Sequence, residues 1–150
     1  MATHVDKPID LLNYVGHELG TTTWLQITQS QVDLFADVTG DHQWIHTDPE
    51  RAATGPFGRT IAHGFLVLSL APRALSEVLT IGSFEAALNY GLNKVRFPSA
   101  APVGSRVRTT VQVESAEQKT AGVEVIFGFS FNIDTIDRPV CVAELVTLYR

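Results

Sequence analysis

The chain has 150 residues, of which 45% are hydrophobic and 18% are charged. This length and composition predict one globular domain over residues 1–150 and exclude a mainly disordered chain. The 16 acidic residues outnumber the 11 Lys and Arg residues, giving a net charge of −5, so we expect no nucleic-acid partner.

The sequence carries no signal for a membrane or for export. No apolar run reaches the roughly 18 residues that a membrane span needs, and residues 1–8 lack the basic and apolar regions of a signal peptide. The one cysteine, Cys141, excludes a disulfide framework and a multi-cysteine zinc site. We therefore expect a cytoplasmic protein that does not bind a membrane.

The first half of the chain is predicted to be mainly helical. Residues 8–15 have a loose apolar face and predict a short helix, and the Thr-rich residues 21–27 predict a strand. Ser30 is the expected N-cap of a second helix, which ends at Gly40.

A short polar and aromatic segment follows that helix. Residues 41–46 are expected to form a loop between two helices, because Asp48 and Pro49 have the types typical of an N-cap and a first helical position. Residues 55–58 then predict a turn.

The most apolar segment of the chain runs from residue 61 to about residue 79. It is apolar on nearly every side, which is typical of a fully buried helix in a globular protein. Pro72 lies within it and predicts a kink or a break.

The second half of the chain is predicted to be strands, because apolar residues there recur at every second position. The expected strands cover residues 84–97, 106–114, 123–134 and about 140–149. Such strands predict an antiparallel sheet with one apolar face, and the apolar helix needs a surface of that kind to cover it. The predicted architecture is therefore α+β, with a curved sheet wrapped around one helix.

Ionisable residues gather between residues 41 and 63. Asp41 and His46 are five residues apart and would not share a helix face, but in a tight loop they can converge on one small volume. A carboxylate and an imidazole placed in this way can hold a water molecule and exchange its protons. In the alternative interpretation, Asp41 only accepts hydrogen bonds from loop amides.

Two further features of the sequence lie near this pair. His42 and His46 are four residues apart beside Asp41, but the glutamate that follows the first histidine in helical zinc proteases is missing, so we expect no metal. His63 and Gly64 begin the apolar helix, where unpaired amides can polarise a carbonyl oxygen. The alternative is that Gly64 only permits close packing.

Basic residues cluster in the predicted sheet. Four of them fall within fifteen residues: Lys94, Arg96, Arg106 and Arg108. In an acidic protein such a cluster can bind a small polyanion, although it can equally be ordinary solvated strand charge.

Taken together, these motifs resemble the MaoC-like (R)-specific enoyl-CoA hydratase family. The resemblance rests on four motifs that span about residues 30–75, with two further stretches at residues 89–98 and 102–106. The four motifs are Gly-Asp-His-Gln-Trp-Ile-His at 40–46, Asp-Pro at 48–49, Ala-Ala-Thr at 52–54 and Thr-Ile-Ala-His-Gly at 60–64. The chain departs from the family pattern at Gln43-Trp44, where Asn-Pro is frequent, and at Pro72, where some members have serine.

The resemblance implies a hot-dog fold, in which a long central helix is wrapped by an antiparallel sheet. It implies reversible hydration of a trans-2-enoyl-CoA to the (R)-3-hydroxyacyl-CoA in fatty acid metabolism, with no cofactor other than the coenzyme A of the substrate. Asp41 and His46 match the catalytic pair, and Gly64 matches the amide that binds the thioester oxygen. Further candidates for support of the site are Gln43, His63 and Ser69.

The resemblance also implies partners. The basic cluster is expected to contact the phosphates of coenzyme A, and an exposed sheet edge is expected to pair two copies of the chain into a homodimer. Two alternative functions stay open, an acyl-CoA thioesterase and a non-catalytic acyl-thioester-binding subunit. The sequence does not give the acyl chain length, nor does it separate coenzyme A from acyl-carrier protein.

Overall fold

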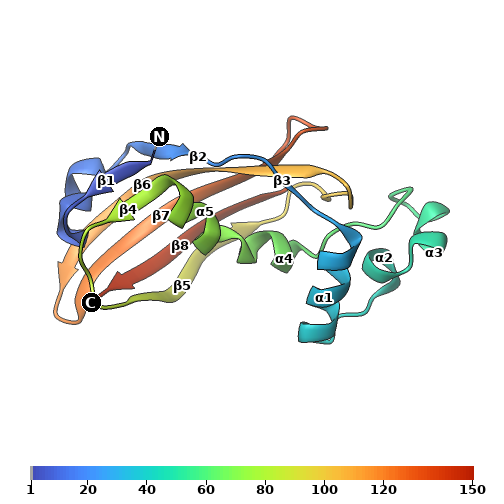
Figure 1. Ribbon diagram of the computed structural model, residues 1–150, viewed down its shortest axis with the longest axis horizontal. Helices are drawn as coiled ribbons and strands as arrows, with labels where there is room; N and C mark the ends of the chain where they lie inside the picture. Colours follow the sequence, from blue (N-terminus) through green and yellow to red (C-terminus); the bar gives the residue numbers. More distant parts are fainter. Residues whose placement is uncertain (1) are drawn as a thin grey trace.

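A curved antiparallel sheet forms the body of the molecule in the computed structural model, which describes residues 2–150 (Figure 1). Its strands follow the order β2-β6-β7-β8-β5, and β3 pairs with β6 beside β2. Their bounds are Glu18–Thr21 (β2), Leu25–Gln26 (β3), Ala87–Arg96 (β5), Arg106–Lys119 (β6), Gly122–Ile133 (β7) and Cys141–Tyr149 (β8). Four of these, β5 to β8, are the strands expected from the alternating pattern of the second half.

The alternation places every second side chain of these strands in the core. Phe127 and Phe131 on β7 are fully buried, and so are Val111 and Val113 on β6. Burial of side chains of this size stabilises a fold by about 1.5–3 kcal/mol each, so this face of the sheet is the main source of stability.

Two helices cross the apolar face of the sheet, α4 (Gly64–Ser69) and α5 (Ala71–Val78) (Figure 1). The expected single helix is therefore broken at Leu70, because Pro72 occupies the first turn of α5 and has no N–H to donate to the preceding turn. The expectation of full burial is wrong: Val67 is buried in α4, but Phe65 is 69% exposed, and the leucines of this segment at 66, 68, 70 and 75 are only half-buried.

The N-terminal region closes one end of the sheet. The expected short helix is the 3₁₀ helix η1 (Pro8–Tyr14), whose Leu11 is fully buried. A small parallel pair, β1 (Thr3–Val5) with β4 (Leu79–Ile81), was not expected. The strand expected over residues 21–27 is split into β2 and β3, although the Thr22 N–H still bonds to Thr109 on β6 at 2.9 Å.

Three short helices lie beyond the opposite end of the sheet: α1 (Gln29–Thr39), α2 (Trp44–Thr47) and α3 (Pro49–Ala53) (Figure 1). Gly40 ends α1 in the left-handed conformation, at φ 80°, and Asp48 caps α3, both as expected. The loop expected over residues 41–46 is wrong in part, because α2 forms within it and contains His46.

The N-cap of α1 is Thr28 rather than the expected Ser30. The Thr28 hydroxyl accepts from the Gln31 N–H at 3.2 Å, and the Gln31 side chain accepts from the Thr28 N–H at 3.0 Å. This reciprocal arrangement satisfies two amides at once, which Ser30, already inside the helix, does not do.

The α+β architecture predicted from the sequence is thus confirmed, with helices on one face of an antiparallel sheet. Within residues 2–150, no helix has the length and apolar character that a membrane crossing requires.

The cap can be tested by a matched pair of substitutions. Thr28→Ala should lower the free energy of unfolding by about 1 kcal/mol, because the Gln31 N–H at the helix start loses its acceptor, the Thr28 hydroxyl. Ser30→Ala should change it by less than about 0.5 kcal/mol, because Ser30 is an exposed helical residue. The urea midpoints of the two variants measure this, and an equal loss in both would contradict the assignment of Thr28 as the cap.

Candidate active site

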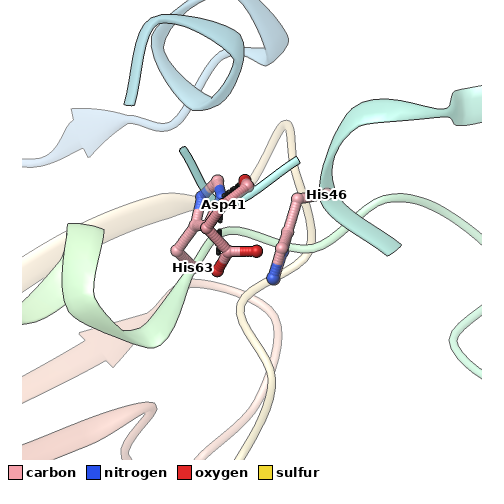
Figure 2. Close-up of side chains that lie close together, drawn as sticks. All are labelled: Asp41, His46 and His63. Carbon is pink, nitrogen blue, oxygen red and sulfur yellow. Dashed lines mark hydrogen bonds and ion pairs between the residues drawn. The ribbon is translucent and has the colours of Figure 1, made fainter. Parts of the chain in front are cut away.

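Three of the sequence-predicted residues converge at the junction between the sheet and the three short helices. Asp41 follows α1, His46 lies in α2, and His63 precedes α4, yet their side chains approach one another closely (Figure 2). One nitrogen or oxygen atom of each lies within 4.8 Å of those of the other two. The fold therefore brings together residues that are up to 22 positions apart in the sequence.

His46 is held in one tautomer by a backbone carbonyl. Its ring is buried, and Nδ1 lies 2.7 Å from the Ile61 oxygen. Because a carbonyl only accepts, Nδ1 must carry the proton, and Nε2 is left with its lone pair. Burial lowers the pKa of His46 below 6.5; the Ile61 hydrogen bond opposes this shift and the neighbouring His63 adds to it. The ring is thus a neutral base near pH 7.

His63 supports both partners of the pair. Its Nε2 donates to the backbone carbonyl of Asp41 at 2.9 Å, which ties down the residue that carries the carboxylate. Its ring stacks on His46, with centroids 3.9 Å apart and planes 25° from parallel, while Phe35 packs at 4.9 Å. The side chain is only 3% exposed, so these contacts hold both residues in a rigid arrangement.

Asp41 is the solvent-facing member of the group. Its side chain is 53% exposed, and one carboxylate oxygen lies 4.0 Å from His63 Nε2. The other accepts from the Gln43 N–H at 3.4 Å, so the loop-amide interaction considered from the sequence exists. This contact is long and leaves lone pairs for a water molecule, which can bridge two groups at this separation.

The same three side chains carry donor atoms of the kinds that bind metal ions. Donors to one ion must point their lone pairs at a common position. The stacked rings of His46 and His63 are nearly parallel, and His63 Nε2 carries the proton that it donates to Asp41. This geometry offers convergent lone pairs from Asp41 and His46 alone, which favours proton transfer over metal binding.

Gly64 lies beside the pair at the start of α4. It lines a pocket of about 290 Å³ together with His46, Phe97 and Val140. Its N–H is the first of the helix and has no partner on the preceding turn. A Cβ at this position would lie 3.0 Å from the Phe97 ring, so only glycine leaves the amide accessible without displacing that ring.

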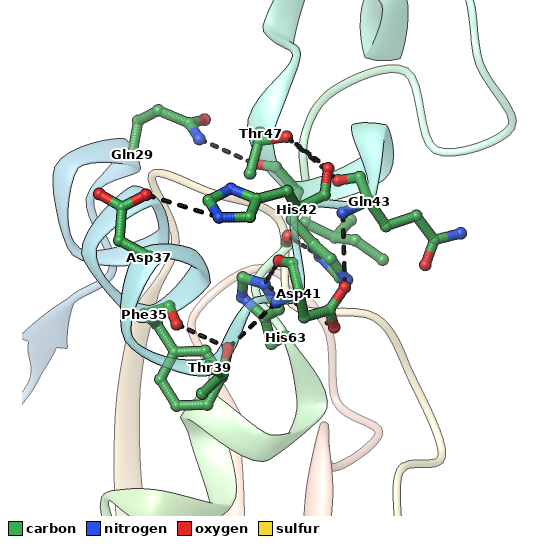
Figure 3. A network of polar contacts seen from close by, with 11 residues as sticks. Gln29, Phe35, Asp37, Thr39, Asp41, His42, Gln43, Thr47 and His63 are labelled. Atoms are coloured by element: carbon green, nitrogen blue, oxygen red, sulfur yellow. Dashed lines mark hydrogen bonds and ion pairs between the residues drawn. The ribbon is translucent and has the colours of Figure 1, made fainter.

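Other contacts that position the site were not predicted from the sequence. Gln29 on α1 donates to the His46 carbonyl at 2.7 Å and accepts from the Thr60 hydroxyl at 2.6 Å, so it joins three segments around the site. His42 turns instead toward Asp37, at 3.7 Å (Figure 3). No sequence motif marks Gln29, because its contacts join residues far apart in the sequence. None marks the Ile61 carbonyl, because a backbone group is present at every residue.

Two of the expected supporting residues do not join the site. The Gln43 amide is directed away from Asp41 (Figure 3), and only the Gln43 backbone contacts that residue. The Ser69 hydroxyl donates to the Leu66 carbonyl at 2.7 Å within α4. Their side chains are therefore occupied elsewhere or exposed, whereas His63 contacts both Asp41 and His46.

The basic residues do not form one cluster. Lys94 and Arg96 lie on β5, and Arg106 and Arg108 lie on β6, with β7 and β8 between the two pairs. Arg106 forms an ion pair with Asp134 at 2.9 Å, and the Arg108 guanidinium lies 4.6 Å from the centre of the Trp24 ring. Proximity in sequence misled here, because the connection between β5 and β6 spans the width of the sheet.

Comparison with known proteins gives a family and a fold. The family model described as "MaoC like domain" matches residues 10–130. The chain is 50% identical over 141 residues to 3-hydroxyacyl-thioester dehydratase Z of Mycobacterium tuberculosis, covering 93% of each chain. Among solved structures it is similar to the R-hydratase PhaJ1 of Pseudomonas aeruginosa, at 24% identity and a TM-score of 0.73, covering 90% of this chain and 81% of that one.

A further solved structure of the same fold is the HadBC (3R-hydroxyacyl-ACP dehydratase) complex of Mycobacterium tuberculosis, with a TM-score of 0.66, 14% identity and coverage of 84% and 90%. Such structures confirm the expected hot-dog fold. The family match over most of the chain confirms the sequence resemblance. The chain belongs to the MaoC-like dehydratase family.

Proposed function

We propose that this protein interconverts trans-2-enoyl and (R)-3-hydroxyacyl thioesters of coenzyme A by adding or removing water. The observation that carries this proposal is the buried His46 base, whose free Nε2 shares one small volume with the Asp41 carboxylate beside the Gly64 amide. The names of a close relative, a 3-hydroxyacyl-thioester dehydratase, and of a neighbour in fold, an R-hydratase, support the same class of reaction.

In the hydration direction, the Gly64 N–H would bind the thioester oxygen and stabilise the negative charge that develops there. His46 Nε2 takes a proton from water as its oxygen bonds to C3, and this proton then passes by way of the Asp41 carboxylate to C2. One water molecule is consumed, His46 ends neutral and Asp41 ends as a carboxylate, so the pair ends as it began. Dehydration follows the same path in reverse.

The proposed activity is tested with crotonyl-CoA. Loss of the enoyl absorbance without release of free thiol is the expected result, followed by identification of the (R)-hydroxy product. Release of thiol would instead show a thioesterase, and no reaction at all would favour a binding subunit.

The catalytic pair is tested by Asp41→Asn, His46→Gln and the double variant. Each single change should lower kcat by about 10²–10⁴ with little change in KM, because each removes a proton carrier that acts in the transition state. The double variant should lose little more than the worse single variant, because the two residues act on one water. Multiplicative losses would place them in separate steps.

The pH dependence of kcat/KM tests the assignment of the base. Activity should fall on the acid side with an apparent pKa below 6.5, because His46 must be neutral and its burial lowers its pKa. In His63→Phe this acid limb should move toward higher pH, since His63 is one of the groups that lowers the pKa of His46.

His63→Phe keeps an aromatic ring for the stack but removes the donor to Asp41, whereas His63→Gln keeps a donor and removes the ring. We expect kcat to fall up to about 10²-fold in the Phe variant, because Asp41 is released from its position. A His63→Phe protein with unchanged kcat and an unchanged acid limb would remove His63 from the account.

The phosphates of coenzyme A are proposed to contact the basic residues of β5 or β6. Among residues 2–150, Lys94 and Arg108 take part in no ion pair within 4.0 Å and can neutralise a ligand. Lys94→Ala combined with Arg108→Ala should raise KM for enoyl-CoA and leave kcat unchanged, while Lys119→Ala serves as a control at the far β6–β7 turn. An unchanged KM at low and high salt would count against these contacts.

The active form is proposed to be a homodimer joined at β5. Within residues 2–150, this ten-residue edge strand pairs with β8 alone, and it exposes Tyr90 (72%) and Leu92 (45%). A long edge with apolar side chains invites pairing with another strand. Light scattering at micromolar concentration should give twice the mass of one chain; the mass of a single chain would contradict this.

A further inference from the structure

The side-chain amide of Gln29, the first residue of α1, makes three hydrogen bonds next to the His46 base. Its Nε2 donates to the His46 carbonyl at 2.7 Å and to a carboxylate oxygen of Asp33 at 2.9 Å. Its Oε1 accepts from the Thr60 hydroxyl at 2.6 Å. Figure 3 shows the amide directed from α1 toward α2, so Gln29 connects elements that the chain itself does not join directly.

These partners fix the orientation of the amide. Its two N–H groups are directed at oxygen atoms that can only accept, the carbonyl of His46 and the carboxylate of Asp33. Rotation of the amide by 180° would place Oε1 against these two oxygens and would break both bonds. Gln29 therefore has to donate toward α2 and accept from Thr60, which only an amide of this length does at once.

The His46 carbonyl needs a donor from outside its own helix. Because α2 has only four residues, Trp44–Thr47, the carbonyl of its third residue has no N–H one turn later within the helix. The residue three positions after His46 is Pro49, which has no N–H to donate. The Gln29 amide supplies the missing donor.

The Thr60 hydroxyl stands at the other end of the same link. Thr60 is 4% exposed and directly precedes Ile61, whose carbonyl accepts from His46 Nδ1 at 2.7 Å. The Thr60 carbonyl accepts in turn from the Val103 N–H at 2.9 Å. Gln29 therefore bonds to the backbone of the residue that carries the ring and to the neighbour of the residue that holds Nδ1.

We propose that Gln29 is a positioning residue for the His46 base. By bonding to both sides of the hydrogen bond between His46 Nδ1 and the Ile61 carbonyl, it keeps the proton on Nδ1 and the lone pair on Nε2. This inference rests on the proposed function, in which Nε2 takes a proton from water. Gln29 does not line the catalytic pocket, so it acts through His46 rather than on the substrate.

Kinetics of crotonyl-CoA hydration test the proposal at both ends of the link. Gln29→Leu keeps the size of the side chain and removes its three bonds, so kcat should fall by about 10- to 100-fold with KM nearly unchanged, as expected for a displaced catalytic group. Thr60→Val should lower kcat in the same direction. Thr60→Ser keeps the hydroxyl and should retain most of the wild-type kcat.

Two further variants complete the kinetic test. The combination of Gln29→Leu with Thr60→Val should lose little more than Gln29→Leu alone, because the Thr60 hydroxyl acts through the Gln29 amide. Gln26→Leu removes an exposed glutamine on β3, outside this network, and is the matched control that should leave kcat and KM unchanged.

The tautomer of His46 separates a positioning role from a general loss of stability. The ¹⁵N shifts of the ring should show Nδ1 alone protonated in wild-type protein and in Thr60→Ser. In folded Gln29→Leu and Thr60→Val a second population, protonated on Nε2, should appear. A folded Gln29→Leu protein with the Nδ1–H tautomer alone, or with unchanged kcat, would overturn the inference and leave the proposed function standing.

Failure of the proposed function gives a different result. If wild-type protein does not hydrate crotonyl-CoA, the proposed function fails, and the ¹⁵N comparison still decides whether Gln29 fixes the tautomer. If Gln29→Leu does not fold, the pair Thr60→Val and Thr60→Ser decides the inference, since equal tautomer populations in these two variants would overturn it.

Discussion

The hydrogen bond from His46 Nδ1 to the Ile61 carbonyl joins the two segments on which the site depends. One segment carries Asp41 and His46 from the end of α1 into α2, and the other leads into the apolar helix at Gly64. The Ile61 N–H bonds in return to the Ile45 carbonyl at 2.9 Å, so backbone and side chain hold the same two segments together. With this link in place, His46 and Gly64 line the same pocket.

Burial divides the three ionisable residues into different roles. His46 and His63 are enclosed by packing and by carbonyl partners, whereas Asp41 stands more than half exposed at the rim. The enclosed pair has fixed tautomers, because each ring donates to a backbone carbonyl that can only accept. The rim position leaves the Asp41 carboxylate accessible to water.

The architecture could be predicted from the sequence because it rests on local periodicity. The period-two alternation of β6 and β7 and the change to an apolar helical segment at residue 61 are visible without coordinates. The proximity of Asp41 and His46 could also be predicted, since both lie in one compact motif.

The parts that escaped prediction depend on distance or on the backbone. Thr28 and Ser30 are both residue types that cap helices. Only the observed start of α1 shows that Thr28 makes the capping hydrogen bond. Gln29 acts on His46 from another helix, and the Ile61 carbonyl has no sequence signature. The basic residues fell within fifteen positions, yet the order of strands separates β5 from β6 by two strands. Phe65 is exposed and Val67 is buried in the same short helix, a difference that composition does not encode.

The central claim is that the Ile61 carbonyl holds His46 with its proton on Nδ1 and its lone pair on Nε2. The ¹⁵N chemical shifts of the His46 ring at pH 7, assigned with the His46→Gln variant, measure this directly. We predict a protonated Nδ1 and an unprotonated Nε2 in the ligand-free protein. A ring protonated on Nε2 alone, or on both nitrogens, would contradict the account, because His46 could not then accept a proton from water.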